Sequence, residues 1–226
     1  MSFKGAELQL HSFFRSTSSA RVRTAANLKK IPLNFVYVNL RNGEQLDDSF
    51  RRVNPNLTVP VLTVTVRDGN SPRRFSICQS MAIMEFFEEA FPSTLPLLPP
   101  LDDPAGRAHV RDLVNIIICD IQPPTNQRIL KRIQQNGGNM EQWAGKIMGE
   151  GLGAFDELAR PSAGSYSYGD QLSLADVVLA PAVENAVRYG VDLDKLPTVK
   201  KVFERIRELE EFKAADWRHQ ADTPRE

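Results

Sequence analysis

The sequence predicts a chain of two domains, in which a mixed α/β domain is followed by an all-helical one. Up to residue 91, short β-branched and aromatic runs alternate with segments whose apolar residues recur at helical spacing. Five prolines then fall within residues 92–104, a composition that neither a helix nor a central strand accommodates. Beyond that stretch only helical spacing recurs. We therefore predict a first domain over residues 1–91, a proline-rich linker over 92–104 and a helical domain over 105–226.

The bulk composition is that of an ordinary globular protein. The 226 residues include 28 basic and 28 acidic side chains, so no excess charge indicates nucleic acid or an acidic membrane as a partner. No apolar run approaches the length of a membrane span, and the first residues lack the apolar core of a signal peptide. Two cysteines, Cys78 and Cys119, are too few for a disulfide framework and fit a reducing compartment. We expect a cytoplasmic protein that binds neither nucleic acid nor membrane.

The first domain is expected to open with a strand, a helix and a second strand. Residues 7–13 are apolar and aromatic, which is typical of a strand. An apolar helical face begins at Val22 and ends at Lys29-Lys30, whose charges suit a helix C-terminus. Residues 33–38 predict the second strand, and the short connections imply a right-handed crossover to a parallel neighbour.

Two more strands and a helix complete this domain. Pro60 cannot donate to a sheet ladder, so it belongs at the start of the third strand or just before it. A cis Val59–Pro60 bond would leave the Val59 N–H and C=O free to pair with an extended ligand. The order β-α-β-α-β-β-α, with this proline, fits a thioredoxin-like domain that lacks the active cysteine pair. The elements expected after residue 40 are a weak helix over 43–53, strands over 63–66 and 74–77 joined by a turn at Asp68-Gly69, and a helix over 80–91 with Ser80 as its N-cap.

Helices alone are expected in the second domain. Gln122-Pro123-Pro124 ends or kinks the first of them. Ser173 is expected to cap the third, with Asp176 reaching back to the cap N–H, an arrangement that stabilises the fold and takes no part in chemistry. The expected helices cover residues 110–121, 140–160, 173–190 and 197–209, and the tail after Trp217 is expected to be irregular. The inner face of the second helix is expected to carry Trp143, Ile147, Phe155 and Leu158, with Gly151 and Gly153 weakening its middle.

Four consecutive hydroxyl side chains, Ser16 to Ser19, lie where the first strand passes into the first helix. Backbone N–H groups at a helix start are unpaired and carry partial positive charge, which favours an anion there. Arg21 and Arg23 add positive charge in the first turns. The stretch predicts either an anion or thiolate site or a Ser/Thr N-cap followed by solvated arginines, and both interpretations stay open at this point.

A second helix start, Gln79-Ser80, also follows a strand end, which is where open α/β sheets place their ligands. It predicts either a second anion site or simple capping. The three histidines, His11, His109 and His219, share no metal-ligand spacing with one another or with cysteines, so no metal site is expected.

The layout and the motifs together resemble the zeta class of cytosolic glutathione transferases. Residues 14–23, Phe-Arg-Ser-Thr-Ser-Ser-Ala-Arg-Val-Arg, are similar to the class signature Ser-Ser-Cys-x-Trp-Arg-Val-Arg, with Ser18 in place of the Cys and Ala20 in place of the Trp. The resemblance covers nearly the whole chain. It implies an α/β thioredoxin-like N-terminal domain plus an all-α C-terminal domain, the cytosolic glutathione transferase fold. Further similar stretches are Asn54-Pro55, Val59-Pro60, Gln79 to Ile83, Asp120 to Pro123, Gly169 to Asp176, Asn185 to Arg188 and Gln220 to Pro224.

This resemblance implies a glutathione-dependent cis–trans isomerase and a homodimer. The implied reaction turns maleylacetoacetate into fumarylacetoacetate in tyrosine and phenylalanine breakdown: the thiolate adds to the double bond, the new single bond rotates, and elimination returns glutathione. A free thiol has a pKa of about 8.5, and a helix N-terminus with nearby cations lowers it. The helix start at Ser16 supplies that environment independently of the family.

The expected site residues are carried over from the same resemblance. Ser16 is the expected hydroxyl donor to the thiolate, with Thr17 and Ser18 as alternatives. Val59, with Pro60 cis, is expected to pair with the cysteinyl backbone of glutathione. The further cofactor contacts are expected from Ser19, Ala20, Arg21, Gln45, Gln79, Ser80, Gln122, Asn126, Gln127 and Arg128, with Gln79 and Ser80 holding the γ-glutamyl carboxylate.

The implied substrate is a small diacid, so cations are expected at its carboxylates. Arg21 and Arg188 are the residues that the resemblance assigns to them, because a guanidinium offers a bidentate fork. Two alternatives remain open from sequence. One is a broad-scope transferase that conjugates haloacids or other electrophiles, and the other is a non-catalytic binding module. Retention of Ser16, Val59-Pro60 and Gln79-Ser80 argues against the module.

Overall fold

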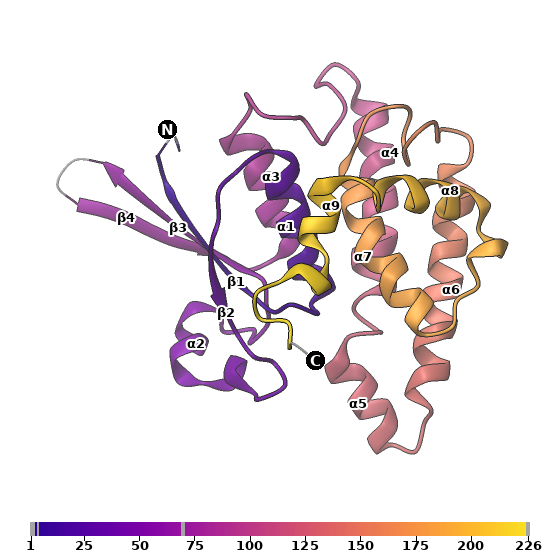
Figure 1. The fold of residues 1–226 in the computed structure, drawn as a ribbon, viewed down its shortest axis with the longest axis horizontal. Helices are drawn as coiled ribbons and strands as arrows, with labels where there is room; N and C mark the ends of the chain where they lie inside the picture. The colour runs from indigo at the N-terminus through magenta and orange to yellow at the C-terminus, as the bar shows by residue number, and fades with distance from the viewer. Residues whose placement is uncertain (1–2, 4, 69–70, 225–226) are drawn as a thin grey trace. The chain divides into compact units, whose positions relative to one another are not determined.

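The computed structural model describes residues 3, 5–68 and 71–224. The chain forms two compact units, one made of the residues up to Pro96 together with those from Glu210 onward, and the other of Leu97–Leu209. The first unit contains the mixed sheet and the second is helical (Figure 1). None of the helices built from the described residues is long and apolar enough to cross a membrane.

The first unit is organised around one four-stranded sheet. Its strands are β1 (Glu7–Ser12), β2 (Asn34–Tyr37), β3 (Val61–Asp68) and β4 (Ser71–Ile77), in the order β2-β1-β3-β4. Strands β1 and β2 are parallel, which confirms the predicted crossover pair, and β3 is antiparallel to both β1 and β4. The predicted turn at Asp68-Gly69 falls in part outside the described residues. This sheet with its helices is the thioredoxin-like fold that the element order predicted.

Up to Pro96 this unit contains α1 (Thr17–Leu28), the 3₁₀ turn η1 (Glu44–Leu46), α2 (Asp48–Val53) and α3 (Ser80–Ala90). Of these, α1 and α3 begin shortly after a strand ends, and they lie side by side (Figure 1). One expectation was wrong by a residue. Gln79 is the N-cap of α3, with extended backbone angles and no side-chain cap hydrogen bond, so Ser80 is the first helical residue and not the cap. The irregular stretch after α3 ends at Asp103, whose side chain caps the helix that begins at Pro104.

The second unit consists of helices joined by short connections. They are α4 (Pro104–Asn115), the π-helical turn η2 (Ile116–Ile121), α5 (Gln127–Gln135), α6 (Met140–Ala159), α7 (Leu174–Arg188), the 3₁₀ turn η3 (Leu193–Lys195) and α8 (Pro197–Ile206). The predicted break at Gln122-Pro123-Pro124 is confirmed, because η2 ends at Ile121 and α5 begins only after Asn126.

The inner face predicted for α6 was partly wrong. Trp143 and Leu158 are 40% and 38% exposed, whereas Met148 and Leu152 are buried together with Phe155. The buried stripe is set by a close approach to η2, since a methyl group at Gly151 would overlap the Ile121 side chain. The glycine that weakens the helix by propensity is therefore the residue that lets it pack.

The capping arrangement predicted at the start of α7 is present. Asp176 is fully buried, and its Oδ2 accepts hydrogen bonds from the Ser173 N–H at 2.8 Å and the Ser173 hydroxyl at 2.9 Å. Its Oδ1 accepts from the Ser167 N–H at 2.8 Å. Burial raises the pKa of this carboxyl, and the hydrogen bonds oppose that shift. The network ties the preceding loop to the helix, which is a structural role.

The end of the chain returns to the first unit. The sequence predicted a last helix through Leu209 and an irregular tail after Trp217. The observed α8 ends at Ile206, a further helix α9 (Glu210–Ala215) forms where the sequence predicted no element, and a 3₁₀ turn η4 (Trp217–His219) begins the tail. Helix α9 lies beside α1 (Figure 1), where Asn27 Nδ2 donates to the Glu211 carbonyl at 2.9 Å. The predicted helical domain covered all of residues 105–226. The observed grouping instead puts the residues from Glu210 onward with the sheet, because α9 packs on α1.

Candidate functional site

Three chain segments meet at one edge of the sheet. Leu62 of β3 pairs with Leu10 of β1 on one side and with Ile77 of β4 on the other. Because β3 runs opposite to both neighbours, its amino end lies at the edge where β1 and β4 have their carboxyl ends. The segments at this edge are residues 13–16 before α1, residues 78–79 before α3 and Val59-Pro60 before β3.

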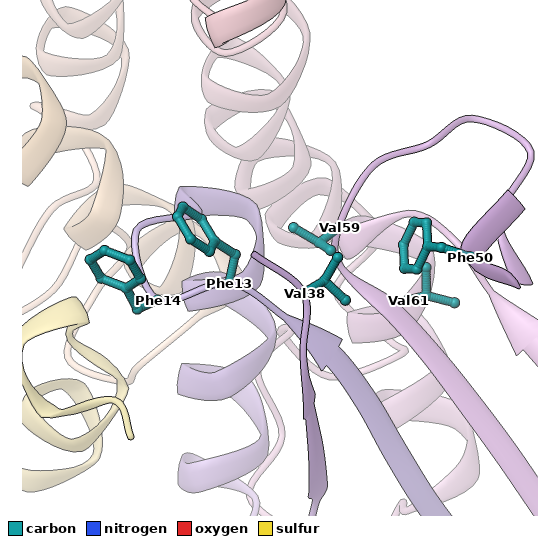
Figure 2. Close-up of a cluster of buried hydrophobic side chains, with 6 residues drawn as sticks. All are labelled: Phe13, Phe14, Val38, Phe50, Val59 and Val61. Atoms are coloured by element: carbon teal, nitrogen blue, oxygen red, sulfur yellow. The ribbon is translucent and has the colours of Figure 1, made fainter. Parts of the chain in front are cut away.

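An apolar cluster supports these segments. Phe13 and Phe14 come from the turn after β1, and Val59 and Val61 lie on either side of Pro60 (Figure 2). Phe13 and Phe14 are in edge-to-face contact with their ring centroids 4.6 Å apart. The six members, all buried, are Phe13, Phe14, Val38, Phe50, Val59 and Val61. Close packing of this kind restricts rotamers, so the backbone above it is held in one conformation.

Ser16 is the N-cap of α1. It has extended angles, φ −75° and ψ 115°, and its Oγ accepts a hydrogen bond from the Ser19 N–H at 3.1 Å. Ser19 is therefore not the cap, and its own hydroxyl is fully buried and unpartnered among the described residues. The cap bond uses a lone pair of Ser16 and leaves its O–H free to donate, so capping and anion binding are compatible at this residue.

The first turn of α1 leaves backbone donors unpaired. In the part of the chain that the structure describes, the N–H groups of Thr17 and Ser18 have no acceptor, as expected for the first residues of a helix. The Ala20 N–H donates to the Ser16 carbonyl at 2.9 Å and begins the regular ladder. Both free donors lie next to the Ser16 hydroxyl in sequence, so three donors converge on one region at the positive end of the helix dipole.

The two arginines of α1 are not solvated, and the interpretation that had them so was wrong. Arg21 and Arg23 are each only 2% exposed. Burial lowers the pKa of Arg21 to about 10, and its Nε has no hydrogen-bond partner among the described residues. Burial also lowers the pKa of Arg23 to about 10, although Asp222 and Asp216 oppose that shift. Among the described residues, Arg21 is thus a buried cation with no acidic side chain paired to it, whereas Arg23 donates five hydrogen bonds.

The other two segments add unpaired polar groups. Val59–Pro60 is a cis peptide, as expected, and among the described residues neither the N–H nor the C=O of Val59 is hydrogen-bonded. At the start of α3, Ser80 is buried, and the first-turn N–H groups have no acceptor within the described part of the chain. The Gln45 Oε1 of η1 is buried without a partner among the described residues. A ligand with an extended peptide backbone and an anionic end would satisfy these groups.

The remaining predicted residues belong to the helical unit. Asn126 caps α5 by accepting from the Arg128 N–H at 3.1 Å, and the side chains of Gln127 and Arg128 are exposed. Gln122 is the half-buried C-cap residue that follows η2. Their assignment to a cofactor site stays a prediction.

Arg188 lies in the last turn of α7 and is exposed. Its guanidinium carbon is 5.4 Å from the ring centroid of Tyr189, and the Tyr189 hydroxyl accepts from Gln127 Nε2 at 3.4 Å. Two predicted residues are thereby joined through a tyrosine that the sequence did not single out. No local pattern marks Tyr189, because its only signal is adjacency to Arg188.

The chain matches two family models, which are described as the glutathione S-transferase N-terminal domain, over residues 15–90, and the glutathione S-transferase C-terminal domain, over residues 127–215. It is 44% identical over 221 residues to the maleylacetoacetate isomerase of Aspergillus fumigatus, and this covers 97% of the present chain and 94% of that protein.

Solved structures of similar proteins match over nearly their whole length. A maleylacetoacetate isomerase from Anaeromyxobacter dehalogenans with glutathione bound in its active site is 37% identical, with a TM-score of 0.87 and coverage of 97% of this chain and 99% of that one. A maleylpyruvate isomerase, a bacterial glutathione S-transferase of the zeta class, is also 37% identical, with a TM-score of 0.85 and coverage of 96% and 100%.

Proposed function

This chain belongs to the zeta class of the glutathione S-transferase family, and from that premise we propose that it is a glutathione-dependent isomerase that converts maleylacetoacetate to fumarylacetoacetate. The observation that carries the proposal is the start of α1. There the Ser16 hydroxyl and the free N–H groups of Thr17 and Ser18 form a donor cluster at a helix N-terminus. Such a cluster stabilises a thiolate over a thiol.

The unpaired groups at the sheet edge fit glutathione. The Val59 N–H and C=O are free to pair with the backbone of its cysteinyl residue, in the manner of an added strand. The free N–H groups at the start of α3, with Gln79 and Ser80, suit the γ-glutamyl carboxylate. The orphaned Gln45 Oε1 is an acceptor for an N–H of the same ligand. When bound, glutathione supplies a thiolate that adds reversibly to the substrate double bond, so that the bond can rotate.

The residues of the chain then have separate tasks. The Ser16 O–H donates to the sulfur and favours its charged form, and Thr17 and Ser18 are the alternatives for this role. Arg21 adds a desolvated positive charge, which stabilises anions more strongly than an exposed charge does. Arg188 is exposed and offers a bidentate fork for a carboxylate of the diacid. Gln122, Asn126, Gln127 and Arg128 complete the proposed cofactor contacts.

A direct comparison of substrates tests this function. We expect the purified protein to isomerise maleylacetone, a close analogue of the substrate, with glutathione returned unchanged. Turnover of a haloacid at equal glutathione concentration should be slower. Faster haloacid turnover, with no isomerisation, would contradict the proposal. Binding to immobilised glutathione without turnover of either substrate would indicate a binding module.

A second candidate, a broad-scope transferase, is favoured by one observation. Ala20 stands where the class signature has Trp and is only half-buried, so the first turn of α1 presents a small side chain with room around it. A wider pocket accepts substrates of more shapes. Replacing Ala20 by Trp should then narrow the range of haloacids and other electrophiles that are turned over, while isomerisation persists.

We also propose that the protein is a cytoplasmic homodimer. The location is supported by two free cysteines, Cys78 half-buried and Cys119 exposed, which are typical of a reducing compartment. The dimer is carried over from the family. Light scattering on the eluting peak of a sizing column, which yields the molar mass, should give twice the 25.4 kDa of the chain, and cell fractionation tests the location.

A further inference from the structure

The turn that delivers Ser16 to the sheet edge is bonded to the far end of the chain. Asp222 lies 208 residues from Phe14, and its Oδ2 accepts the Phe14 N–H at 2.8 Å. The Ser16 N–H in turn donates to the Phe13 carbonyl at 3.0 Å. The position of the cap residue is therefore coupled to a backbone that the carboxylate of Asp222 holds.

Arg23 binds the carbonyl groups of the same turn, whereas Asp222 binds one of its N–H groups. Its Nη1 donates to the Ser12 hydroxyl at 3.0 Å and to the Phe13 carbonyl at 3.4 Å, and its Nη2 donates to the Phe14 carbonyl at 3.2 Å. Its Nε and Nη2 also donate to the Ala215 carbonyl at 3.0 and 2.9 Å. One buried guanidinium thus joins the end of α9 to two successive carbonyls of the turn.

The chain end is itself folded against this turn. The Phe14 ring lies 6.4 Å from the Trp217 ring, and the Arg15 guanidinium lies 4.6 Å above the Trp217 ring. Thr223 Oγ1 donates to the Trp217 carbonyl, and Gln220 Nε2 donates to the Asp216 carbonyl at 2.8 Å. Residues 216–224, which we call the C-terminal strap, therefore present Asp222 from a structured element.

Covering the turn does not by itself require a carboxylate. An apolar side chain at position 222 would also cover the turn, but it would leave the Phe14 N–H without its acceptor. The Oδ1 of Asp222 is itself buried and has no partner among the described residues. Leaving a buried polar atom unpaired costs free energy, so its retention calls for an explanation. The N–H that donates to Asp222 belongs to Phe14, two residues before Ser16. The carboxylate therefore holds the backbone that leads into Ser16.

We propose that Asp222 and Arg23 are positioning residues, which fix the Phe13–Ser16 backbone so that the Ser16 hydroxyl and the first N–H groups of α1 converge on the glutathione thiol. Asp222 accepts a hydrogen bond from an amide of the turn, and Arg23 donates to two of its carbonyls. Together these bonds restrict the backbone of the turn to one conformation. The inference rests on the proposed function only in naming the glutathione thiol as the group toward which these donors are directed. Neither residue touches the reacting atoms.

Hydrogen exchange of the protein alone tests the bond without any ligand. The Phe14 amide should exchange at least about tenfold more slowly than an unbonded turn amide. It should lose this protection in Asp222→Ala and keep it in Asp222→Asn, whose amide oxygen accepts the same N–H. An unprotected Phe14 amide in the unmutated protein would overturn the proposal even if Asp222→Ala failed to fold.

The functional consequence is read from the bound thiol. Ultraviolet absorbance of the thiolate, followed against pH at saturating glutathione, should show a higher thiol pKa in Asp222→Ala and in Arg23→Lys, whose ammonium lacks the fork. Turnover should fall about tenfold while the glutathione dissociation constant changes less than about threefold, since misplacing a group by a fraction of an ångström affects reactivity more than binding. Asp222→Asn should restore both.

Val66→Ala is the matched control for stability. Val66 is buried in β3, where it pairs with Arg73 at the end of the strand away from the site, so its loss destabilises the same unit through a cavity. It should leave the thiol pKa unchanged. An equal pKa in Asp222→Ala and Val66→Ala, or a failure of Asp222→Asn to restore it, would overturn the positioning role. Absence of isomerisation in the unmutated protein would instead overturn the proposed function, because the thiolate titration does not depend on turnover.

Discussion

Ser16 serves two functions with one hydroxyl group. Its oxygen accepts the Ser19 N–H and caps α1, while its hydrogen remains available for an external anion. Sequence reasoning treated the cap and the anion site as alternatives at this stretch. The structure makes them compatible, because a hydroxyl can accept one bond and donate another.

The Ser16→Ala change should lower isomerase turnover about a hundredfold, as the loss of a preorganised donor to a charged group does, with less than about a threefold change in glutathione affinity. It should also lower the free energy of unfolding by about 1 kcal/mol through loss of the cap. Steady-state kinetics and urea denaturation measure the two effects. Ser16→Thr keeps both the cap and the donor and should be nearly silent. A large loss in Thr17→Val or Ser18→Ala, with Ser16→Ala active, would move the role to that neighbour.

Arg21 and Arg23 are two residues apart and differ in their surroundings. Arg23 donates five hydrogen bonds and is part of the structure, whereas Arg21 is equally buried with its Nε unpartnered among the described residues. A buried charge without a partner destabilises the fold and is typical of a group kept for a ligand.

Replacing Arg21 by Met should stabilise the protein and weaken anion binding. The folded pKa of about 10 lies below the ordinary value of an arginine, so the folded state binds fewer protons than the unfolded state between the two values and stability rises with pH there. At neutral pH the charged form costs up to about 3 kcal/mol, which Arg21→Met removes. Urea denaturation at pH 7 and calorimetric titration of a diacid inhibitor measure the two effects. Lower stability with unchanged affinity would show that Arg21 has a structural partner instead.

Arg188→Ala should mainly raise the Michaelis constant for a diacid substrate, by about tenfold, because it removes a bidentate partner of a carboxylate. The turnover number and the free energy of unfolding should change little, since the side chain is exposed. The exposed Arg132 of α5 offers a control, and Arg132→Ala should leave all three values unchanged. Equal kinetics for the two variants would remove Arg188 from the substrate site.

At the scale of elements, packing overrides propensity in α6. The helix contains Gly151 and Gly153, which its sequence alone marks as weak points. Their surroundings differ, because a Cβ at position 151 would overlap the Ile121 side chain of η2, while a Cβ at position 153 would meet nothing within 4 Å. One glycine is required by the contact between the two helices and the other is not.

This pair gives a matched prediction with opposite signs. Gly151→Ala should destabilise the protein by about 1–3 kcal/mol, the usual cost of overpacking. Gly153→Ala should stabilise it by up to about 1 kcal/mol through helix propensity. Thermal and urea denaturation of the two variants measure the difference. Equal effects of the two substitutions would show that η2 can move aside and that the contact is loose.

At the scale of the whole molecule, chain order and spatial grouping differ at the C-terminus. Residues from Glu210 onward belong to the unit that contains the sheet, although the helical unit separates them from it in sequence. The start of α1 is consequently stabilised by the last residues of the chain. Ligand binding at that helix start is therefore expected to stabilise the unit that both chain ends share.

Glutathione should raise the melting temperature of the protein by mass action. At a hundred times its dissociation constant it should add about 2.7 kcal/mol to the free energy of unfolding. Differential scanning fluorimetry over a range of glutathione concentrations measures this. Gln79→Ala should lose most of the shift, whereas Asp194→Asn, which removes an exposed ion pair with Lys200 in the other unit, should retain it. A shift that is retained in full by Gln79→Ala would place the ligand elsewhere.

Elements that depend on local signals were predictable from sequence. The parallel β1–β2 pair, the break after Ile121 and the capping network of Asp176 were all expected, because strand patterning, proline geometry and capping involve residues close together in the chain. The start of α1 was recognised for the same reason, and the family resemblance added the roles of its residues.

By itself, the sequence determined the starts of α1 and α7 and the break after Ile121, because caps and proline geometry act over a few residues. Only the tertiary structure decided that Arg21 and Arg23 are buried, that α6 turns Trp143 outward and that Asp222 holds the turn before Ser16. Each of these depends on what packs against a residue, and that partner can be 208 positions away, as for Phe14 and Asp222. Burial and long-range hydrogen bonds are properties of such pairs, which no local pattern records.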